Sequence, residues 1–467
     1  MTDSLYAAIR SAIRDESRTC FITEAGEQMS YRDLLEQTGR IARYFESQSI
    51  MPGDRIVVQA PKSLELVALY LATLQIGAVF VPLNTAYTQS EIHYFLEDAQ
   101  PKVFIQDARE IAHLAGALEP LPGCVSRSSS DTAAIVYTSG TTGRSKGAML
   151  SHGNLVSNAR ALCAAWGFTQ DDVLLHALPI FHVHGLFVAL HCALLSNCSM
   201  AWLARFDETA VLKLLPQVSV MMGVPTFYTR LLATPKFTKE AASKVRLFIS
   251  GSAPLLETAF HDFEARTGKR ILERYGMSEA AIITSNPLEG DRVAGSVGYP
   301  LPGIDLRITG DEIGMIEIRG PNVFSGYWRS QEKTDESFTS DGFFITGDLG
   351  RADPDGRVWV TGRAKDLVIS GGYNVYPKEI ELILDEIEGV TESAVIGVPH
   401  PDFGEAVVAV VVGSAEERDV ISRAAARLAS FKVPKRVFAV SSLPRNALGK
   451  VEKNTLRKTF SETFVSK

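Results

Sequence analysis

The feature that most constrains the fold is the alternation of apolar helical patterns with short runs of β-branched residues over the first 250 positions. These runs are RIVVQA (55–60), AVFVPL (78–83), KVFIQD (102–107), AAIVYTSG (133–140), VSVMMGV (218–224) and RLFISG (246–251). Buried strands that are separated by helical crossovers form parallel sheets with helices on their faces. We therefore predict an α/β fold built on layered, largely parallel sheets.

From about residue 295 the pattern changes to short strands and turns with frequent glycine and proline, which indicates a β-rich subdomain. A strand then ends within 356–372, and a new α/β pattern begins, with an amphipathic helix at 379–387 and strands at 392–398 and 406–412. We predict a large N-terminal domain over residues 1–364, made of layered mixed sheets and helices. A small C-terminal α+β domain follows over 365–467.

The apolar stretch from Leu64 to Leu83 is long enough to be considered as a membrane span. It contains Glu65, Gln75, Gly77 and Pro82, which a membrane-spanning helix would not favour. We predict a buried helix that stops at Gly77 and is followed by a strand. The N-terminal residues are not an apolar secretory signal either, and no membrane partner is expected.

Charge and cysteine content exclude further classes of protein. The formal net charge of −7 argues against nucleic-acid binding, which needs clustered lysine and arginine. The number of cysteines is odd and none has CxxC spacing, so a disulfide framework is not expected. A reducing compartment, and hence a cytoplasmic location, fits best. The cysteines are Cys20, Cys124, Cys163, Cys192 and Cys198.

A loop rich in glycine and hydroxyl residues follows the predicted strand at 133–140. It has the sequence YTSGTTGRSKG (137–147), which does not match the Walker pattern G-x-x-x-x-G-K-[ST]. Glycines nevertheless let the backbone approach an anion, hydroxyl groups donate hydrogen bonds, and a lysine adds charge. From these residues alone, a phosphate-binding loop and a solvated loop remain equally good interpretations. The candidate contacts are Thr138, Ser139, Gly140, Thr141, Thr142, Gly143 and Lys146.

Together with later motifs, this loop resembles the signature loop of the adenylate-forming enzymes, which include acyl-CoA synthetases, luciferases and the adenylation domains of peptide synthetases. The later motifs are ERYGMSE (273–279), TGDLG (346–350), GRAKDLVISGGYNVYPKEIE (362–381) and PRNALGK (444–450). The resemblance covers nearly the whole chain and implies a mobile C-terminal lid. It also implies that a carboxylate is first adenylated by ATP with Mg²⁺ and is then transferred to the thiol of coenzyme A.

The resemblance implies that Lys450 bridges the incoming carboxylate and the α-phosphate of ATP. A lone lysine near the end of a chain is usually solvated, and only the motif PRNALGK favours the catalytic role. The adenylation step needs fixed cations and donors rather than a protein nucleophile, because negative charge gathers around one phosphorus. The resemblance further implies that Glu279 binds Mg²⁺ and that Ser278 donates to the α-phosphate. An acid at the start of a helix is the alternative for Glu279.

Nucleotide contacts are implied for several of the same motifs. Tyr275 is expected to stack on adenine, with a core tyrosine as the alternative. Asp348 is expected to bind both ribose hydroxyls beside Arg363, since one carboxylate can accept two O–H bonds. The opposite wall of the pocket is expected from SGSAP (250–254). The other candidates for nucleotide contact are Ser252, Ala253, Glu273, Arg274 and Gly276.

The resemblance also places a hinge and a coenzyme A tunnel after residue 363. Lys365 falls at the family's hinge, where one polar residue can absorb a large dihedral change. The following SGGYNVYP is expected to line the pantetheine tunnel, and its glycines suit a backbone that passes close to a ligand. The candidates there are Gly371, Gly372 and Tyr373.

Three further stretches of the sequence bear on the acyl pocket. The stretches 176–189, 223–232 and 284–298 resemble those of family members that activate malonate. A dicarboxylate would leave its second carboxylate in the pocket, where an unpaired charge is costly. Arg292 is the preferred partner, since a guanidinium matches a carboxylate with two N–H groups. A surface ion pair with Asp291 is the alternative.

Weaker candidates for the acyl pocket are Arg230, on a predicted helix, and His182 and His184. The histidines in this segment follow no common zinc spacing, so a pocket wall is expected rather than a metal site. The motif YGMSEA departs from the family's usual YGMTET and is followed by the apolar Ala281, Ile282 and Ile283. These residues leave room for methylmalonate or a short monocarboxylate.

The sequence therefore predicts an ATP-dependent acid–thiol ligase that acts on malonate or methylmalonate. An acyl-CoA synthetase for short or medium monocarboxylic acids is one alternative, and a non-catalytic nucleotide-binding protein with the same fold is another. The expected partners are small molecules, namely a dicarboxylic acid, ATP and coenzyme A. No carrier-protein segment is expected after Lys467.

Overall fold

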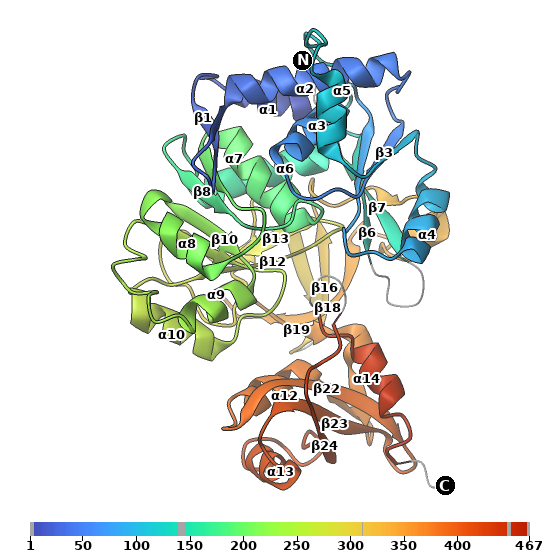
Figure 1. Ribbon diagram of the computed structural model, residues 1–467. Coiled ribbons are helices and arrows are strands. Elements are labelled where there is room, and N and C mark those ends of the chain that lie inside the picture. The colour runs from blue at the N-terminus through green and yellow to red at the C-terminus, as the bar shows by residue number, and fades with distance from the viewer. Residues whose placement is uncertain (1–3, 139–144, 311, 446–449, 465–467) are drawn as a thin grey trace. The chain divides into compact units, whose positions relative to one another are not determined.

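The structure, a computed structural model, describes residues 4–138, 145–310, 312–445 and 450–464. The chain forms two compact units (Figure 1). One comprises residues up to 306 together with 318–344, and the other comprises 307–317 together with 345–467. Both combine helices with sheets, which confirms the predicted α/β class. The predicted boundary between residues 364 and 365 lies inside the second unit, and it stays a prediction.

The larger sheet of the first unit has nine strands. In spatial order they are β14 (Tyr299–Pro300), β13 (Ala281–Ser285), β12 (Leu272–Met277), β11 (Leu247–Ser250), β10 (Val220–Gly223), β8 (Val173–His176), β9 (Ser199–Trp202), β1 (Thr19–Thr23) and β2 (Gln28–Ser30). The strands from β12 to β1 run parallel, and the outer pairs are antiparallel. The carboxyl ends of β8, β10, β11 and β12 therefore meet at one edge, where ligands bind in α/β sheets.

The second sheet of this unit has six strands. In spatial order they are β17 (Gly326–Tyr327), β7 (Lys146–Ser151), β6 (Thr132–Thr138), β4 (Val79–Pro82), β3 (Arg55–Val58) and β5 (Val103–Ile105). The strands β6, β4, β3 and β5 are parallel, and β7 returns antiparallel to β6. The glycine-rich loop thus joins the two strands of a hairpin, and all six predicted strand runs are confirmed.

Helices cover both sheets of the first unit. They are α1 (Leu5–Ala12), α2 (Tyr31–Ser47), α3 (Leu64–Gln75), α4 (Gln89–Ala99), α5 (Ala108–Ala115), α6 (His152–Ala165), the π-helix η1 (His184–Leu190), α7 (His191–Ser196), α8 (Glu208–Leu214), the 3₁₀-helix η2 (Leu215–Gln217), α9 (Pro225–Leu232), α10 (Glu257–Thr267) and α11 (Gln331–Asp335). Helices α8, α9 and α10 lie close together in Figure 1. Their apolar side chains form one buried core with β10 and β11, which includes Tyr228, Phe248 and Phe263.

Helix α3 confirms the prediction for the apolar stretch that resembled a membrane span. Ser63 caps its N-terminus by accepting a hydrogen bond from the N–H of Leu66, and its residues are buried from Leu66 to Gln75. Gly77 follows with a φ of +74°, a conformation that glycine adopts without strain, and β4 begins two residues later. No helix among the described residues has the length and apolar character that crossing a membrane requires.

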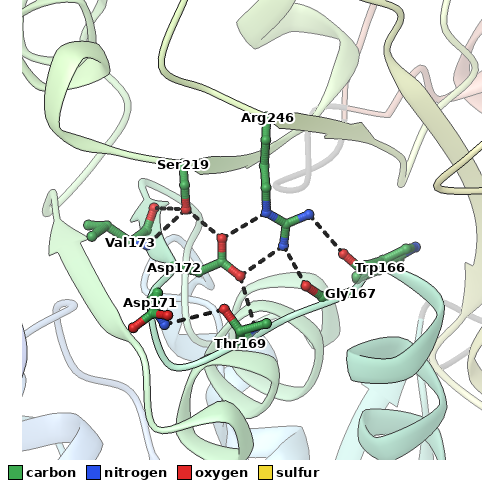
Figure 2. A network of polar contacts seen from close by, with 8 residues as sticks. All are labelled: Trp166, Gly167, Thr169, Asp171, Asp172, Val173, Ser219 and Arg246. Carbon is green, nitrogen blue, oxygen red and sulfur yellow. Dashed lines mark hydrogen bonds and ion pairs between the residues drawn. The ribbon is translucent and has the colours of Figure 1, made fainter.

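A partly buried ion pair holds the amino ends of β8, β10 and β11 together (Figure 2). The side chain of Asp172, only 5% exposed, accepts hydrogen bonds from Nε and Nη2 of Arg246, both at 2.8 Å. The hydroxyl of Ser219 donates a third at 2.6 Å. Arg246 also donates to the carbonyls of Trp166 and Gly167 at the end of α6. This cluster lies at the edge opposite the strand ends that carry candidate site residues.

We expect Asp172→Asn to lower the free energy of unfolding by about 3 kcal/mol, because it leaves a partly buried guanidinium without its counter-charge. Burial raises the pKa of Asp172, but hydrogen bonds from Arg246 and Ser219 outweigh it, so that the pKa is lowered. The ion pair therefore stabilises the folded state above about pH 4, since this is the pKa of an aspartate in the unfolded chain. This stabilisation is lost as the pH falls through the pKa of Asp172 in the folded protein. Urea unfolding of both proteins between pH 7 and pH 3 measures this.

The matched control is Asp305→Asn, which removes an exposed carboxylate that pairs with Arg319 at 2.8 Å. Exposed pairs contribute about 0.5 kcal/mol, so this variant should unfold almost as the wild type does. Equal losses in the two variants would contradict the role given to Asp172. The role would also be contradicted if the wild type remained more stable than the Asp172 variant at the lowest pH.

The second unit contains most of a four-stranded sheet and all of a five-stranded sheet. The first consists of β15 (Asp305–Thr309), β16 (Gly314–Arg319), β18 (Phe344–Ala352) and β19 (Val358–Arg363). The second consists of β21 (Tyr373–Val375), β20 (Val368–Ser370), β23 (Gly404–Gly413), β22 (Val390–His400) and β24 (Arg436–Val440), which pairs with β23. Helices η3 (Ala364–Asp366), α12 (Pro377–Asp385), α13 (Glu417–Ala425) and α14 (Lys453–Thr459) complete the unit.

Strand β23 explains the run AVVAVVV, because it is buried on both of its faces. Val407, Ala409 and Val411 pack with α12 and α13 in one core. Val408 and Val410 face a second core that includes Leu456 of α14. Alternate residues of a strand point to opposite sides, so a strand covered on both sides needs an unbroken apolar run. The helix and the two strands predicted between 379 and 412 are confirmed.

Candidate active site

Glu279 lies in the turn between β12 and β13, next to the base of the glycine-rich loop. Its Oε1 accepts hydrogen bonds from Oγ1 of Thr138 at 3.4 Å and from the hydroxyl of Tyr327 at 3.1 Å. Burial, together with the Glu279 carboxylate, raises the pKa of Tyr327, so its hydroxyl stays protonated and donates. The tertiary structure thus joins two motifs that are far apart in the sequence, and it adds Tyr327, which no sequence motif indicated.

The described ends of the glycine-rich loop place one cation next to Tyr327, which donates to this acid. Thr138 and Lys146 face each other across β6 and β7. The Nζ of Lys146 lies 4.8 Å from the centre of the Tyr327 ring. A carboxylate and an ammonium group therefore both contact Tyr327, the first at its hydroxyl and the second at its ring. The predicted contacts Ser139, Gly140, Thr141, Thr142 and Gly143 lie outside the described residues.

The backbone around the two strand ends at β11 and β12 has an uncommon conformation. Ser252 and Ala281 have φ values of +71° and +49°, which non-glycine residues adopt only when their surroundings enforce them. Gly276 is required by a close approach, since a Cβ there would lie 2.0 Å from the carbonyl oxygen of Ala281. Such strain concentrates at ligand sites, which supports a functional role for this edge of the sheet.

The other predicted nucleotide contacts of β11 and β12 differ in exposure. Tyr275 and Ser278 are partly buried, and Ala253 is exposed. Glu273 is buried, and burial raises its pKa to about 8, so that it is mostly protonated at neutral pH. Its Oε1 accepts a hydrogen bond from the N–H of Gly295 at 3.1 Å. Their roles toward a nucleotide stay predictions.

Arg274 is a buried cation at the same strand ends. A Cβ at Gly251 would lie 2.4 Å from Cζ of Arg274, so the guanidinium passes directly over this glycine. Its Nε and Nη2 atoms have no hydrogen-bond partner among the described residues. Burial lowers the pKa of Arg274 to about 9, which still leaves the side chain charged at neutral pH. A buried guanidinium with unused N–H groups is suited to bind an anion.

His184 lies at the start of η1, within range of electrostatic interaction with this guanidinium. Its Nδ1 is 3.2 Å from Oγ of Ser252, and its Nε2 has no partner in the described part of the chain. Burial, followed by the charge of Arg274 and by His182 and His176, lowers the pKa of His184. His184 therefore stays neutral at neutral pH. Together, Arg274, His184 and Ser252 present polar atoms at the edge where the parallel strands end.

The structure gives the other candidate arginines different partners. Arg292, which the sequence analysis preferred, donates to the carbonyls of Pro287, Leu288 and Arg270. Asp291, its alternative partner, pairs with Arg270. Arg230 lies on α9, as predicted, where it is more than half exposed and pairs with Glu208. The roles of Arg292 and Arg230 in substrate binding stay predictions, without a contact that supports them.

The apolar residues after the YGMSE motif lie in the core. Ile282 and Ile283 belong to β13 and are buried, as Ala281 is. The amide of Asn158 hydrogen-bonds both the N–H and the carbonyl of Ile282. These side chains are thus part of the sheet's packing. The sequence provided no signal that would distinguish this position from a pocket wall.

The histidines between residues 176 and 191 have different hydrogen-bond partners. Nε2 of His191 lies 2.8 Å from the hydroxyl of Tyr70, and Nδ1 of His176 lies 2.9 Å from Nζ of Lys62. Nδ1 of His182 accepts a hydrogen bond from the N–H of His184. In the described parts of the chain, no group of three or more His, Cys, Asp or Glu side chains is arranged to hold a metal ion.

The second unit contains the predicted ribose site and the predicted hinge. Asp348 of β18 and Arg363 of β19 are cross-strand partners, with Nε and Oδ1 3.0 Å apart. The Asp348 side chain is only 5% exposed. Lys365 follows in η3, where burial, followed by the charge of Arg363, lowers its pKa. Asp366 pairs with Arg457 of α14 at 2.7 Å.

The remaining candidates also lie in the second unit. Gly371 and Gly372 form the two-residue turn between β20 and β21, with φ values of +58° and +82°. A tight hairpin needs positive φ at both positions, which glycine allows. Tyr373 is 59% exposed and stacks on Phe431. Lys450 is exposed and precedes Val451, which bridges to Arg445.

Comparisons with known proteins agree with these observations. The family model described as "AMP-binding enzyme" matches residues 9–328, and that described as "AMP-binding enzyme C-terminal domain" matches residues 379–450. A malonate–CoA ligase of Arabidopsis thaliana is 35% identical over 98% of this chain and 89% of its own length. A long-chain-fatty-acid–CoA ligase of Bacillus subtilis is 30% identical over 96% and 92%.

The structural comparison gives the same result. The crystal structure of ATP-bound MatB from Rhodopseudomonas palustris has a TM-score of 0.97 and is 48% identical, over 99% of this chain and 100% of that one. O-succinylbenzoate coenzyme A synthetase from Bacillus subtilis, in complex with AMP, has a TM-score of 0.88 and is 26% identical over 98% of each chain. The similarity therefore extends over both compact units.

Proposed function

The chain belongs to the family of AMP-binding enzymes, and from this membership we propose that it is an ATP-dependent ligase that joins malonate to coenzyme A. One carboxylate of malonate attacks the α-phosphorus of ATP, and the bond to the departing pyrophosphate breaks. The thiol of coenzyme A then loses its proton and attacks the acyl carbon. The bond between that carbon and the phosphate oxygen breaks, and AMP leaves.

The observation that carries the choice of a dicarboxylic acid is the buried guanidinium of Arg274. Its unused N–H groups can bind the second carboxylate, the one that does not react, and His184 and Ser252 lie close by. A buried carboxylate without such a partner would be strongly unfavourable. A monocarboxylic acid would instead leave the guanidinium unpaired. Arg274 therefore replaces Arg292 as our first candidate for this contact.

The residues around Glu279 suit the nucleotide's phosphates. Bound Mg²⁺ neutralises phosphate charge, and Glu279 would hold it together with oxygens of ATP, because Mg²⁺ commonly takes one or two carboxylates plus phosphates. Tyr327 and Thr138 orient the Glu279 carboxylate through their hydrogen bonds. Lys146 adds a positive charge next to the Tyr327 ring. The reaction needs such charge stabilisation rather than a protein nucleophile.

In the second unit, we assign the ribose hydroxyls to Asp348 beside Arg363, and the developing charge at the α-phosphorus to Lys450. The reaction requires that Lys450 be brought to ATP, and Lys365 is the proposed hinge. The turn at Gly371 and Gly372, with Tyr373, is the proposed coenzyme A contact. The family resemblance supports these roles, and Asp348 has the buried, paired geometry that a ribose ligand needs.

We further propose a reducing, cytoplasmic location and no partner other than small molecules. All five cysteines are free in the structure, and Cys20, Cys192 and Cys198 are buried. The net charge of −7 supports the absence of nucleic acid among the partners.

The proposal is tested with a panel of acids that are assayed for AMP formation in the presence of ATP, Mg²⁺ and coenzyme A. We expect kcat/KM for malonate to exceed that for acetate or butyrate by at least about 100-fold, because a site built to pair a polar group rejects analogues that lack it. Methylmalonate should rank between them. Equal or better turnover of butyrate would overturn the substrate, and no AMP with any acid would overturn the activity.

A further inference from the structure

We propose that Lys62 is a positioning residue for the acyl pocket, and that it acts through His176 and Gly185 on the first turn of η1. That turn carries His184, which contacts Ser252 and interacts electrostatically with Arg274. The inference rests on the proposed function, because it assigns Lys62 to the recognition of the acid's second carboxylate. Lys62 lies immediately before α3, where the sequence alone would suggest a solvated side chain.

Lys62 is a partly buried cation whose three N–H groups all have acceptors. Its Nζ lies 2.9 Å from Nδ1 of His176, 2.8 Å from the carbonyl oxygen of His176 and 2.7 Å from that of Leu203. The ammonium also lies 4.0 Å from the centre of the Trp202 ring. An ammonium group has three donors, so this set of acceptors uses them completely. The described contacts of Lys62 include no carboxylate.

These contacts determine which nitrogen of His176 carries the proton. Lys62 can only donate, so Nδ1 of His176 must accept, and the proton of the neutral ring is on Nε2. Nε2 then donates to the carbonyl oxygen of Gly185 at 2.9 Å. The hydrogen bonds therefore run in one direction from Lys62 through His176 to Gly185. Without Lys62, the other tautomer of His176 becomes available, and it cannot donate to Gly185.

The backbone at Gly185 is packed closely against another backbone segment. A Cβ at Gly185 would lie 2.0 Å from the carbonyl oxygen of Pro179, so two backbone segments touch there. The residue belongs to the first turn of a π-helix, a rare element that is frequent at functional sites. His184 precedes it, with Nδ1 3.2 Å from Oγ of Ser252. A displacement of this turn would move His184 relative to Ser252 and Arg274.

A role limited to core stability is the alternative. Burial of an ammonium without a counter-charge is costly, and an apolar side chain would fill the same space more cheaply. Burial also lowers the pKa of Lys62. A residue that is costly for stability, and whose hydrogen bonds end at the turn that carries His184, is better explained by substrate positioning. The two explanations differ in what its removal does to the binding of malonate and of ATP.

The experiment compares Lys62→Met with a matched control, Arg55→Met, in the full-length enzyme. Like Lys62, Arg55 donates its side-chain N–H groups to backbone carbonyls, in this case those of Gly53, Ala99 and Gln100. Arg55 lies on β3 of the six-stranded sheet. We expect Lys62→Met to raise the KM for malonate about 10- to 30-fold and to leave the KM for ATP within about threefold. Arg55→Met should lower the melting temperature and leave both KM values within about threefold.

Unchanged KM values in Lys62→Met, or equal increases for malonate and ATP, would overturn the proposal. If Lys62→Met does not fold, Lys62→Gln, which keeps two donors without the charge, is measured against the same criteria. The wild-type acid panel is run first. Should it prefer another acid, the proposed function fails, and Lys62 is then tested with that acid, so the two failures remain distinguishable.

Discussion

Lys450→Ala is expected to slow adenylation about a thousandfold and to leave thioester formation from supplied malonyl adenylate close to the wild-type rate. Two unit charges 4 Å apart interact by roughly 4 kcal/mol at an effective dielectric constant near 20. Each 1.4 kcal/mol lost from the transition state is about tenfold in rate. The first half-reaction is measured by malonate-dependent exchange of pyrophosphate into ATP. The second is measured by malonyl-CoA formation from malonyl adenylate and coenzyme A.

Lys458→Ala is the matched control, because it removes another exposed lysine from the same C-terminal segment. It should leave both half-reactions within about twofold of the wild type. Equal losses in the two half-reactions of Lys450→Ala would contradict the assignment, since a general defect in folding or binding would affect both. An unchanged exchange rate would remove Lys450 from the mechanism.

Arg274→Met is expected to lower kcat/KM for malonate about 100- to 4000-fold. Breaking a buried charge pair by removing one partner costs about 3–5 kcal/mol, and each 1.4 kcal/mol is about tenfold. Butyrate has no second carboxylate, and the variant no longer buries an unpaired guanidinium, so kcat/KM for butyrate should rise. The measurement is the ratio of the two values in the wild type and the variant, with the KM for ATP as the internal check.

The same assay on Arg292→Met and Arg230→Met decides between the three arginines. Arg292 donates to three backbone carbonyls, so its loss should lower the melting temperature more than it alters the preference for malonate. A loss of malonate preference in Arg292→Met, together with an unchanged preference in Arg274→Met, would restore the sequence-based assignment and reject ours. A parallel rise in the KM for ATP would place Arg274 at the nucleotide.

The division of the candidate residues between the two compact units has a mechanistic consequence. Glu279, Arg274 and His184 belong to the first unit, whereas Asp348 and Lys450 belong to the second. The proposed reaction needs contributions from both. Substitutions of these residues in the first unit should therefore affect recognition of the acid and of Mg²⁺. Substitution of Lys450 should affect the rate of adenylation.

Much of the fold could be predicted because the signals are local. Strand β23 is buried on both faces and needs an unbroken apolar run, and AVVAVVV provides one. Ser63 and Gly77 delimit α3, because one caps its first turn and the other adopts a positive φ after its end. The motifs around Glu279, Asp348 and Lys450 were likewise recognisable, because each is a short contiguous segment.

The sequence by itself determined the class of fold, the positions of its most apolar strands and of helix α3, and the motifs that mark the family, since all of these depend on neighbouring residues. Only the tertiary structure decided which arginine is free to meet a second carboxylate. Arg292, Arg230 and Arg274 are chemically equal in the sequence. Folding gives Arg292 three carbonyl partners and pairs Arg230 with Glu208. It buries Arg274 against Gly251, with N–H groups that no described residue uses. Burial and hydrogen-bond partners come from segments distant in the chain, and no local pattern encodes them.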